Sequence, residues 1–385
     1  MSEIKVNSIK GVGASAAAIT VNNSDGTCTA NITNNLSNRN LIINGAMQVA
    51  QRGTSSTSSA TSVKYQVDRF FVFADATDQA SFTHAQVSDA PTGFSKSFKL
   101  SVGTAETTLD ANEALQFVQR IEAQNLQQLD NGLSTAKSVT LSFYVKSYQT
   151  GTFNVNLYKS DNTVRHISAT YTVNQSATWE KKTITFAGDT SGGGIDDDNG
   201  NGLDIYWHLA AGSNFTSADS TSWGNYSAAG FAYGQAVNLM SSTDNYWQIT
   251  GVQLEVGSVA TDFEHRSFAQ ELILCQRYCQ KLGAGNGTYD CMATGNGVYN
   301  TKAYIPYRLM TSMRSTPSFT LLGSASDFYY TRDGGEYAVS NITLDQAGLN
   351  MVAVLATVST GISNDEGIRL YNINNTGGLL FTAEL

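Results

Sequence analysis

Ten short runs with strand-like patterns follow one another between residues 65 and 256, and no helical period separates them. Turns rich in Gly, Asn, Asp and Ser lie between the runs. Strands that follow one another so closely pair antiparallel, and the alternation in VTLSFYV indicates a sheet with one wet face. The pattern predicts an all-β chain whose main part is an antiparallel β-sandwich of the jelly-roll kind. The ten runs are YQVDRFFVFA, QASFTHAQV, SKSFKLSVG, LQFVQRIEA, SVTLSFYVKS, TFNVNLYKS, TVRHISATYTV, WEKKTITFA, LDIYWHLAA and NYWQITGVQLEV.

Composition narrows the class of protein. Only 14% of the 385 residues are charged, and the net charge of −9 without a basic stripe argues against nucleic acid as a partner. The longest apolar run, LNMVAVLATVS, is too short to span a bilayer, so we expect a soluble protein made in a cytoplasm, with no membrane insertion. The four cysteines form no CxxC pair, and we expect them to be reduced and buried.

The chain divides into four parts by pattern. Residues 1–36 hold too few large apolar residues for a core, so this segment is expected to fold on another protein or on copies of itself. Residues 37–265 form the predicted sandwich, 266–282 a linking helix, and 283–385 a smaller C-terminal β domain.

The predicted helix has its own apolar spacing. Apolar residues recur at intervals of four, three, four and three, which is typical of a helix that packs lengthwise on other helices. Two interpretations remain open: an oligomer seam on a three-fold axis, or a helix docked on its own sandwich. The residues are Phe268, Leu272, Cys275, Cys279 and Leu282.

Several phrases of the sequence resemble, in their order, tail fibre and receptor-binding proteins of tailed bacteriophages, particularly marine ones. The resemblance covers roughly residues 37–282, and the opening MSEIKVN is similar too. The part from SVTLSFYVKS through ITGVQLEVG is similar to carbohydrate-binding jelly-roll modules. The phrases are LIINGAMQVAQRG, YQVDRFF, QRIEAQNL, SFYVKS, WEKKTITFAGDTSGG, ITGVQLEVG and TDFEHRSFAQELILCQRY.

The resemblance implies a structural virion protein of the tail, made in the host cytoplasm. It implies a homotrimer that attaches to the phage tail or an adaptor through residues 1–36 and recognises a host cell-surface polysaccharide or outer-membrane component. Two alternatives remain: a polysaccharide depolymerase, and a head-decoration or adaptor protein without a receptor role.

Catalysis is not expected, because none of the four histidines belongs to a known catalytic motif. The carboxylate pair most worth examining is Asp204 with Glu255, since both lie beside tryptophans in strands.

The stretch IDDDNGNGLD places carboxylates among glycines, a pattern that can bind calcium. The candidate ligands are Asp196, Asp198 and Asp204, and the alternative is a solvated acidic turn. No other cofactor is expected.

Aromatic residues in loops are candidate glycan platforms, because flat rings stack on the C–H faces of sugars. Trp223 and Tyr226 lie in a long irregular stretch, whereas Trp207 and Trp247 lie in strands and are expected in the core. In the C-terminal domain, a Gly-Gly turn carries Tyr, Arg and Asp, a combination suited either to recognition or to a trimer contact. These candidates are Tyr329, Tyr330, Arg332 and Asp333.

Overall fold

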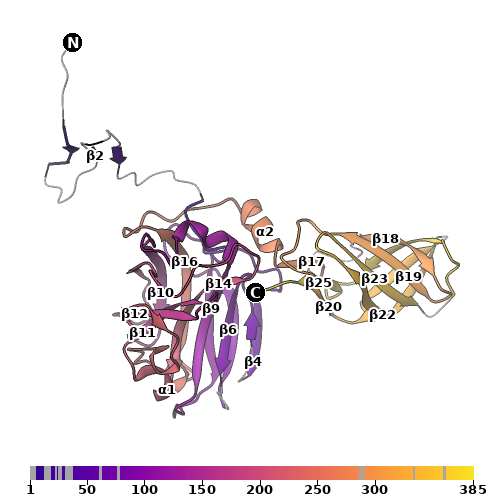
Figure 1. Cartoon of the computed structure of the whole chain (residues 1–385). Coiled ribbons are helices and arrows are strands. Elements are labelled where there is room, and N and C mark those ends of the chain that lie inside the picture. Colours follow the sequence, from indigo (N-terminus) through magenta and orange to yellow (C-terminus); the bar gives the residue numbers. More distant parts are fainter. Residues whose placement is uncertain are drawn as a thin grey trace.

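The computed structural model describes residues 6–12, 19–21, 24, 28–30, 38–59, 63–75, 79–285, 289, 291–332, 334–358 and 361–385. Its fold confirms the predicted class: an all-β chain with an antiparallel sandwich, a linking helix and a smaller C-terminal β domain (Figure 1).

Two antiparallel sheets form the sandwich. The six-stranded sheet runs, in spatial order, β13 (Glu180–Phe186), β10 (Val139–Ser147), β16 (Tyr246–Val256), β8 (Ser97–Thr104), β7 (Ser81–Val87) and β4 (Ser55–Ser59). The seven-stranded sheet runs β15 (Gly224–Asn225), β12 (Arg165–Val173), β11 (Gly151–Lys159), β14 (Asn201–Ala211), β9 (Ala114–Glu122), β6 (Phe70–Asp75) and β5 (Val63–Tyr65). Short helical turns in the connections are η1 (Ala123–Leu129), α1 (Ser213–Thr216), η2 (Ala228–Gly230) and η3 (Leu239–Ser241).

Nine of the ten predicted runs correspond to single strands, and the first divides into two. YQVDRFFVFA crosses from β5 into β6, and Arg69 in the turn between them has a left-handed φ of 72°. The pattern missed β4, because its sequence SSTSS contains no apolar residue.

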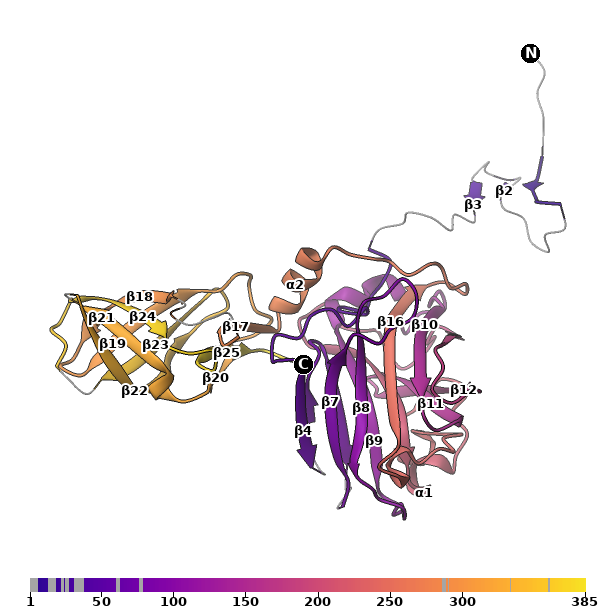
Figure 2. The same ribbon diagram turned by 180° about the vertical axis from the view of Figure 1, so that it is seen from behind.

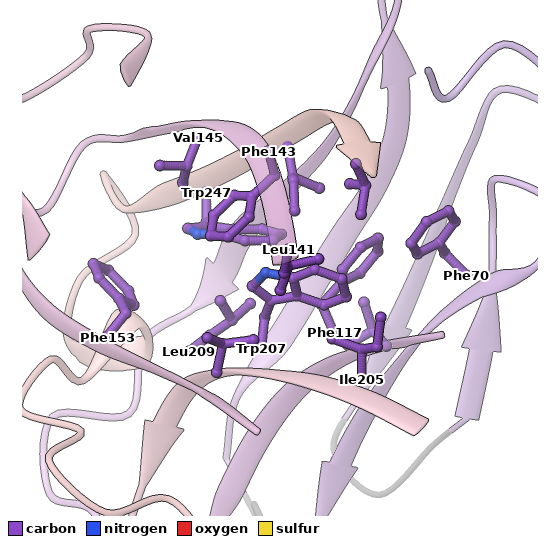
Figure 3. Packing of buried hydrophobic residues seen from close by; sticks show 14 of the residues in the cluster. Phe70, Phe117, Leu141, Phe143, Val145, Phe153, Ile205, Trp207, Leu209 and Trp247 are labelled. Carbon is purple, nitrogen blue, oxygen red and sulfur yellow. The ribbon is translucent and has the colours of Figure 1, made fainter. Parts of the chain in front are cut away.

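Aromatic rings fill the space between the sheets, as Figure 3 shows. The Phe117 ring lies 5.9 Å from Trp207 and 5.4 Å from Trp247, measured between centroids, and Phe143 meets Trp207 edge-on at 5.8 Å. Both tryptophans have 0% exposed surface, which confirms the core positions expected for them.

The linking helix α2 (Phe268–Gln276) is shorter than predicted. Ser267 and Gln270 form a capping box at its start, and Cys275 is buried on its inner side. Cys279 and Leu282 are not helical, so the prediction of one helix through Leu282 is wrong.

These two residues belong to β17 (Cys279–Gly283), whose main chain pairs with β25 (Gly378–Thr382). The partner strand comes from the far end of the chain, which no local pattern can indicate. Burial is as expected for Cys275 and Cys279, but Cys291 is exposed.

The C-terminal domain is a closed six-stranded barrel with its own hydrophobic cluster. Its strands, in order around the barrel, are β18 (Cys291–Val298), β19 (Lys302–Arg308), β23 (Met351–Val358), β22 (Gly335–Ala347), β21 (Phe328–Arg332) and β24 (Gly367–Asn372). A three-stranded sheet of β17, β25 and β20 (Ser318–Leu322) lies between barrel and sandwich (Figure 2), and η4 (Ala325–Asp327) precedes β21.

A charged joint connects barrel and sandwich. Glu384, next to the last residue, forms ion pairs with Arg69 and, at 2.8 Å, with Arg52 of the sandwich. The Arg69 guanidinium lies 3.4 Å above the centre of the Tyr278 ring. These contacts hold the returning end of the chain against the sandwich.

Part of the N-terminal segment forms a small antiparallel sheet of β1 (Ser8–Ile9), β2 (Ile19–Val21) and β3 (Cys28–Ala30). Figure 1 shows this sheet apart from the sandwich. Of the helices in the described ranges, none is long and apolar enough to cross a membrane.

Removal of the Phe117 ring from the centre of the core should make the sandwich less stable. Phe117→Ala is expected to lower the free energy of unfolding by about 3–5 kcal/mol, because it leaves a cavity between the tryptophans. Urea titration followed by tryptophan fluorescence measures this, since all four tryptophans lie in the sandwich. Val259→Ala, at a residue 67% exposed, should change the value by less than about 0.5 kcal/mol. Equal effects of the two substitutions would contradict this account of the core.

Candidate functional site

A pocket of about 690 Å³ opens where the two sheets come together at one edge of the sandwich. β13 ends the six-stranded sheet there, and β12 with the short β15 ends the seven-stranded one. We call it the edge pocket. Its lining residues are Arg165, Ile167 to Thr170, Thr185 to Ser191, and Thr221 to Trp223.

A buried charge cluster holds one wall of the edge pocket. Asp189 has no exposed surface, and both of its carboxylate oxygens accept from Arg165 Nε, at 3.1 and 3.0 Å. Lys159 Nζ lies 3.5 Å from Asp189 and donates to the carbonyl oxygens of Gly192 and Gly193 at 3.0 and 2.6 Å. Burial lowers the pKa of Lys159, and Asp189 opposes that shift. The loop after β13 is therefore tied to both β11 and β12.

Gly192 allows this close approach. Its φ is +76°, and a Cβ at this position would lie 2.1 Å from Cδ of Arg165. Any larger residue would displace the arginine that organises the wall.

Trp223 also lines the edge pocket, and its side chain and main chain are both anchored. Its indole N–H donates to the carbonyl oxygen of Ala187 at 2.7 Å, and its own carbonyl oxygen accepts from Arg165 Nη2 at 3.1 Å. The side chain is half-buried and packs against the sandwich core. Arg165 Nη1 also donates to Asn225 Oδ1 at 3.0 Å, so one guanidinium positions the whole turn.

The rest of the lining is rich in hydroxyl groups. Exposed side chains at the mouth are those of Thr170, Thr185, Thr190, Ser191, Thr221 and Ser222. An indole ring beside several hydroxyls can stack on an apolar sugar face and exchange hydrogen bonds with its hydroxyl groups. The arrangement suits binding of a polyhydroxylated ligand.

The structure separates Tyr226 from Trp223. Tyr226 is 43% exposed but does not line the edge pocket. Its ring lies 5.4 Å from both Tyr158 and Phe231, above the outer face of the seven-stranded sheet. There the chain covers its own sheet, because Phe231 also packs on the buried His208 at 5.1 Å.

The three carboxylates predicted to bind calcium do not come together. Asp204 lies in β14 and pairs with Arg120 at 3.5 Å, whereas Asp196 and Asp198 are exposed in the preceding loop. Asp198 accepts instead from the main-chain N–H of Gly200 at 2.7 Å. Among the described residues, no group of three His, Cys, Asp or Glu could hold a metal ion, so this set is wrong.

Asp204 and Glu255 do not form a carboxylate pair either. Asp204 is in the seven-stranded sheet and Glu255 in the six-stranded sheet. Glu255 accepts from the Thr261 main chain and hydroxyl at 2.9 and 2.6 Å, and it lies 3.7 Å from Arg39. Both carboxylates therefore have structural partners on different sheets.

The candidates in the barrel have mixed positions. Tyr330 has no exposed surface and belongs to the barrel core, so the prediction that it contacts a ligand is wrong. Tyr329 is half-buried, 6.4 Å from Tyr371. Arg332 lines a shallow pocket of about 710 Å³ and pairs with Glu366 at 2.9 Å. Asp333 lies outside the described residues.

Sequence reasoning missed the residues that build the edge pocket. Arg165 lies in a predicted strand, and Asp189 lies in the Gly-rich turn after WEKKTITFA, whose sequence indicates neither a charge cluster nor a pocket. The available signal was a carboxylate just past a strand end, with three consecutive glycines beginning three residues later.

No protein-family model matches the chain, and no curated protein matches it. Several solved structures are similar to part of this chain at low identity and low TM-score. The enzymatically active domain of tailspike protein 4 from Bacteriophage CBA120 is 15% identical, with a TM-score of 0.28, and the match covers 56% of this chain but only 21% of that one.

Two carbohydrate-binding modules are similar over nearly their whole length. The family 11 module of a cellulosomal cellulase from Clostridium thermocellum is 16% identical, with a TM-score of 0.27, and the match covers 54% of this chain and 100% of the module. The CBM22-1 xylan-binding domain from Paenibacillus barcinonensis is 9% identical, with a TM-score of 0.27 and coverage of 57% and 96%. Scores this low identify neither a family nor a ligand for this chain.

Buried Asp204 should make stability depend on pH. Burial raises its pKa from 3.8 to about 6, and Arg120 only partly opposes this. As pH rises from about 4 to about 6, the unfolded state loses this proton while the folded state keeps it, so the free energy of unfolding falls. The expected loss relative to Asp204→Asn is about 3 kcal/mol, at about 1.36 kcal/mol per pH unit.

Urea titrations at several pH values measure this difference between wild type and Asp204→Asn. Asp197→Asn, in the exposed loop, should follow the wild-type curve. A constant difference between wild type and Asp204→Asn from pH 4 to pH 7 would show that burial does not perturb this carboxyl group.

Proposed function

We propose that this chain is a structural protein of a phage tail fibre and that it binds a host-surface glycan in the edge pocket. The observation that carries the binding proposal is the pocket itself: one indole ring and six exposed hydroxyl side chains around a wall fixed by buried charges. The fibre role rests on the order of phage-like phrases in the sequence. In this proposal the protein resides in the virion tail, and residues 1–36 attach it to the tail or an adaptor.

Binding without cleavage fits the chemistry of the lining. Cleavage of a glycosidic bond generally needs two carboxyl groups on either side of it. Among the described residues that line the edge pocket, Asp189 is the one carboxylate, and it is buried and paired with Arg165 and Lys159. The proposed role is therefore recognition, and several chains in one fibre would multiply a weak single-site affinity.

Trp223 should carry much of the glycan affinity. Trp223→Ala is expected to weaken binding on the order of tenfold to a hundredfold, because the stacking surface is lost. Trp223→Phe should lose less, since it keeps a ring but not the N–H bond to Ala187. Binding to an array of bacterial O-antigen and capsular oligosaccharides measures the effect.

Tyr299→Ala provides the matched control, since it removes a 71% exposed ring in the barrel domain. Circular dichroism should show that each variant remains folded. Unchanged glycan binding by a folded Trp223→Ala variant would exclude the edge pocket as the binding site.

A trimer is the proposed assembly, and the outer side of α2 supports it. Phe268 and Ile273 are each 56% exposed and Leu274 37%, and a pocket of about 390 Å³ lies beside the last two. Such apolar residues favour burial against another chain.

Light scattering after size exclusion should give a mass near three times 41.2 kDa. Ile273→Asp should shift the population toward smaller species, because it places a charge in the contact. A wild-type monomer at all concentrations would overturn the trimer and favour a decoration or adaptor role.

A further inference from the structure

We infer that the ligand of the edge pocket is an uncharged glycan, and that the pocket discriminates against sugars that carry carboxylate or phosphate groups. This inference rests on the proposed glycan-binding function and adds the chemical class of the ligand. It follows from how the charges that line the pocket are used.

Among the described residues that line the pocket, Arg165 and Asp189 carry charge, and they form an ion pair at 3.0 Å. The second cation of the cluster, Lys159, lies behind the wall with a fully buried side chain. Arg165 has 11% of its side chain exposed and holds Asp189, which has none. Its remaining contacts go to Asn225 Oδ1 and to the carbonyl oxygen of Trp223. A bidentate grip on a ligand carboxylate would need this guanidinium to leave its partners.

Breaking that arrangement would be costly. Asp189 would remain buried with Lys159 as its one charged partner, at 3.5 Å, and the Trp223 turn would lose its anchor. Removing one partner from a buried ion pair is strongly destabilising, because it leaves an uncompensated charge in a medium of low dielectric constant. An anionic sugar could therefore pair with the Arg165 guanidinium only by breaking the contacts that Arg165 makes with Asp189, Asn225 and Trp223.

The surroundings of the pocket are acidic. Asn162, in the turn between β11 and β12, contacts the continuation of the wall loop: its side-chain amide donates to the Gly194 carbonyl oxygen at 2.7 Å and to Asp196 Oδ1 at 3.3 Å. Burial raises the pKa of Asp161, and the neighbouring Asp196 and Asp198 add to this. With a net charge of −9, the chain repels polyanions before contact.

The Thr221 hydroxyl already donates to Asp219 at 2.8 Å, and the Thr185 hydroxyl bonds Thr140 and the Ser258 carbonyl oxygen. The exposed hydroxyls of Thr170, Thr190, Ser191 and Ser222 and the Trp223 ring are the groups offered to a ligand. Threonine and serine hydroxyls both donate and accept, so they match the hydroxyl groups of a neutral sugar. Such binding depends little on salt, because no counterion is displaced and no exposed ion pair forms.

Matched hexasaccharides test this inference on the full chain. The probes are gluco-, galacto- and manno-hexasaccharides and their counterparts oxidised to uronates at C6, each immobilised through its reducing end. Biolayer interferometry at about 25 mM and about 500 mM NaCl gives the affinities. We expect at least one neutral member to bind about tenfold or more tightly than its uronate, with less than about a twofold change between the two salt concentrations.

Two variants link the result to the lining. Ser222→Lys places a cation at the exposed mouth and should raise affinity for the uronate of the preferred pair by about tenfold. Trp223→Ala should weaken binding of both members of that pair.

The outcomes separate the two proposals. Tighter binding of a uronate by wild type, or a steep loss of affinity with salt, would overturn the neutral class while leaving a glycan-binding function in place. Binding of none of the six probes would count against the proposed function itself.

Discussion

Two antiparallel sheets pack on one layer of aromatic rings, and this packing determines which residues face outward and where the edge of the sandwich opens. Trp207 and Trp247 come from opposite sheets and meet the same Phe117 ring. Because strand residues alternate, an inward Trp207 places its neighbours on the outer face of its sheet. The same packing brings β12, with the short β15 beside it, and β13 together at one edge, and the pocket opens there. The edge pocket is thus a consequence of the sheet arrangement.

Charge is scarce in this chain, at 14% of residues, and two buried clusters have structural consequences. Asp189 ties the pocket wall to Arg165 and Lys159, which fixes the geometry of the pocket and engages the guanidinium group in its lining. Glu384 ties the chain end to two sandwich arginines, Arg52 and Arg69. Each cluster joins segments that are distant in sequence. The ion pairs therefore fix the relative positions of these segments more specifically than hydrophobic packing alone would.

Local pattern predicted most of the fold, and long-range pairing explains what it did not predict. Strand alternation located nine runs correctly, because half-buried strands impose a period of two. The spacing of apolar residues by four and three through Cys279 and Leu282 predicted a helix. This segment is a strand instead, because its main chain pairs with β25. Intrinsic patterns cannot report a partner about 100 residues away.

The candidate site was predictable only in part. Trp223 stood out as an aromatic residue in an irregular segment, and the structure places it in the edge pocket. Its partners Arg165 and Asp189 meet only through tertiary packing. The predicted calcium ligands do not come together, because Asp204 lies in β14 and its side chain pairs with Arg120 instead of facing the acidic loop.

Hydrogen–deuterium exchange of the full chain, with and without a glycan that it retains, tests the central claim most directly. The account predicts slower exchange in peptides covering residues 185–191 and 221–223, which line the edge pocket, and no change in the barrel. Protection around Arg332 in the barrel, with none at the sandwich edge, would contradict it.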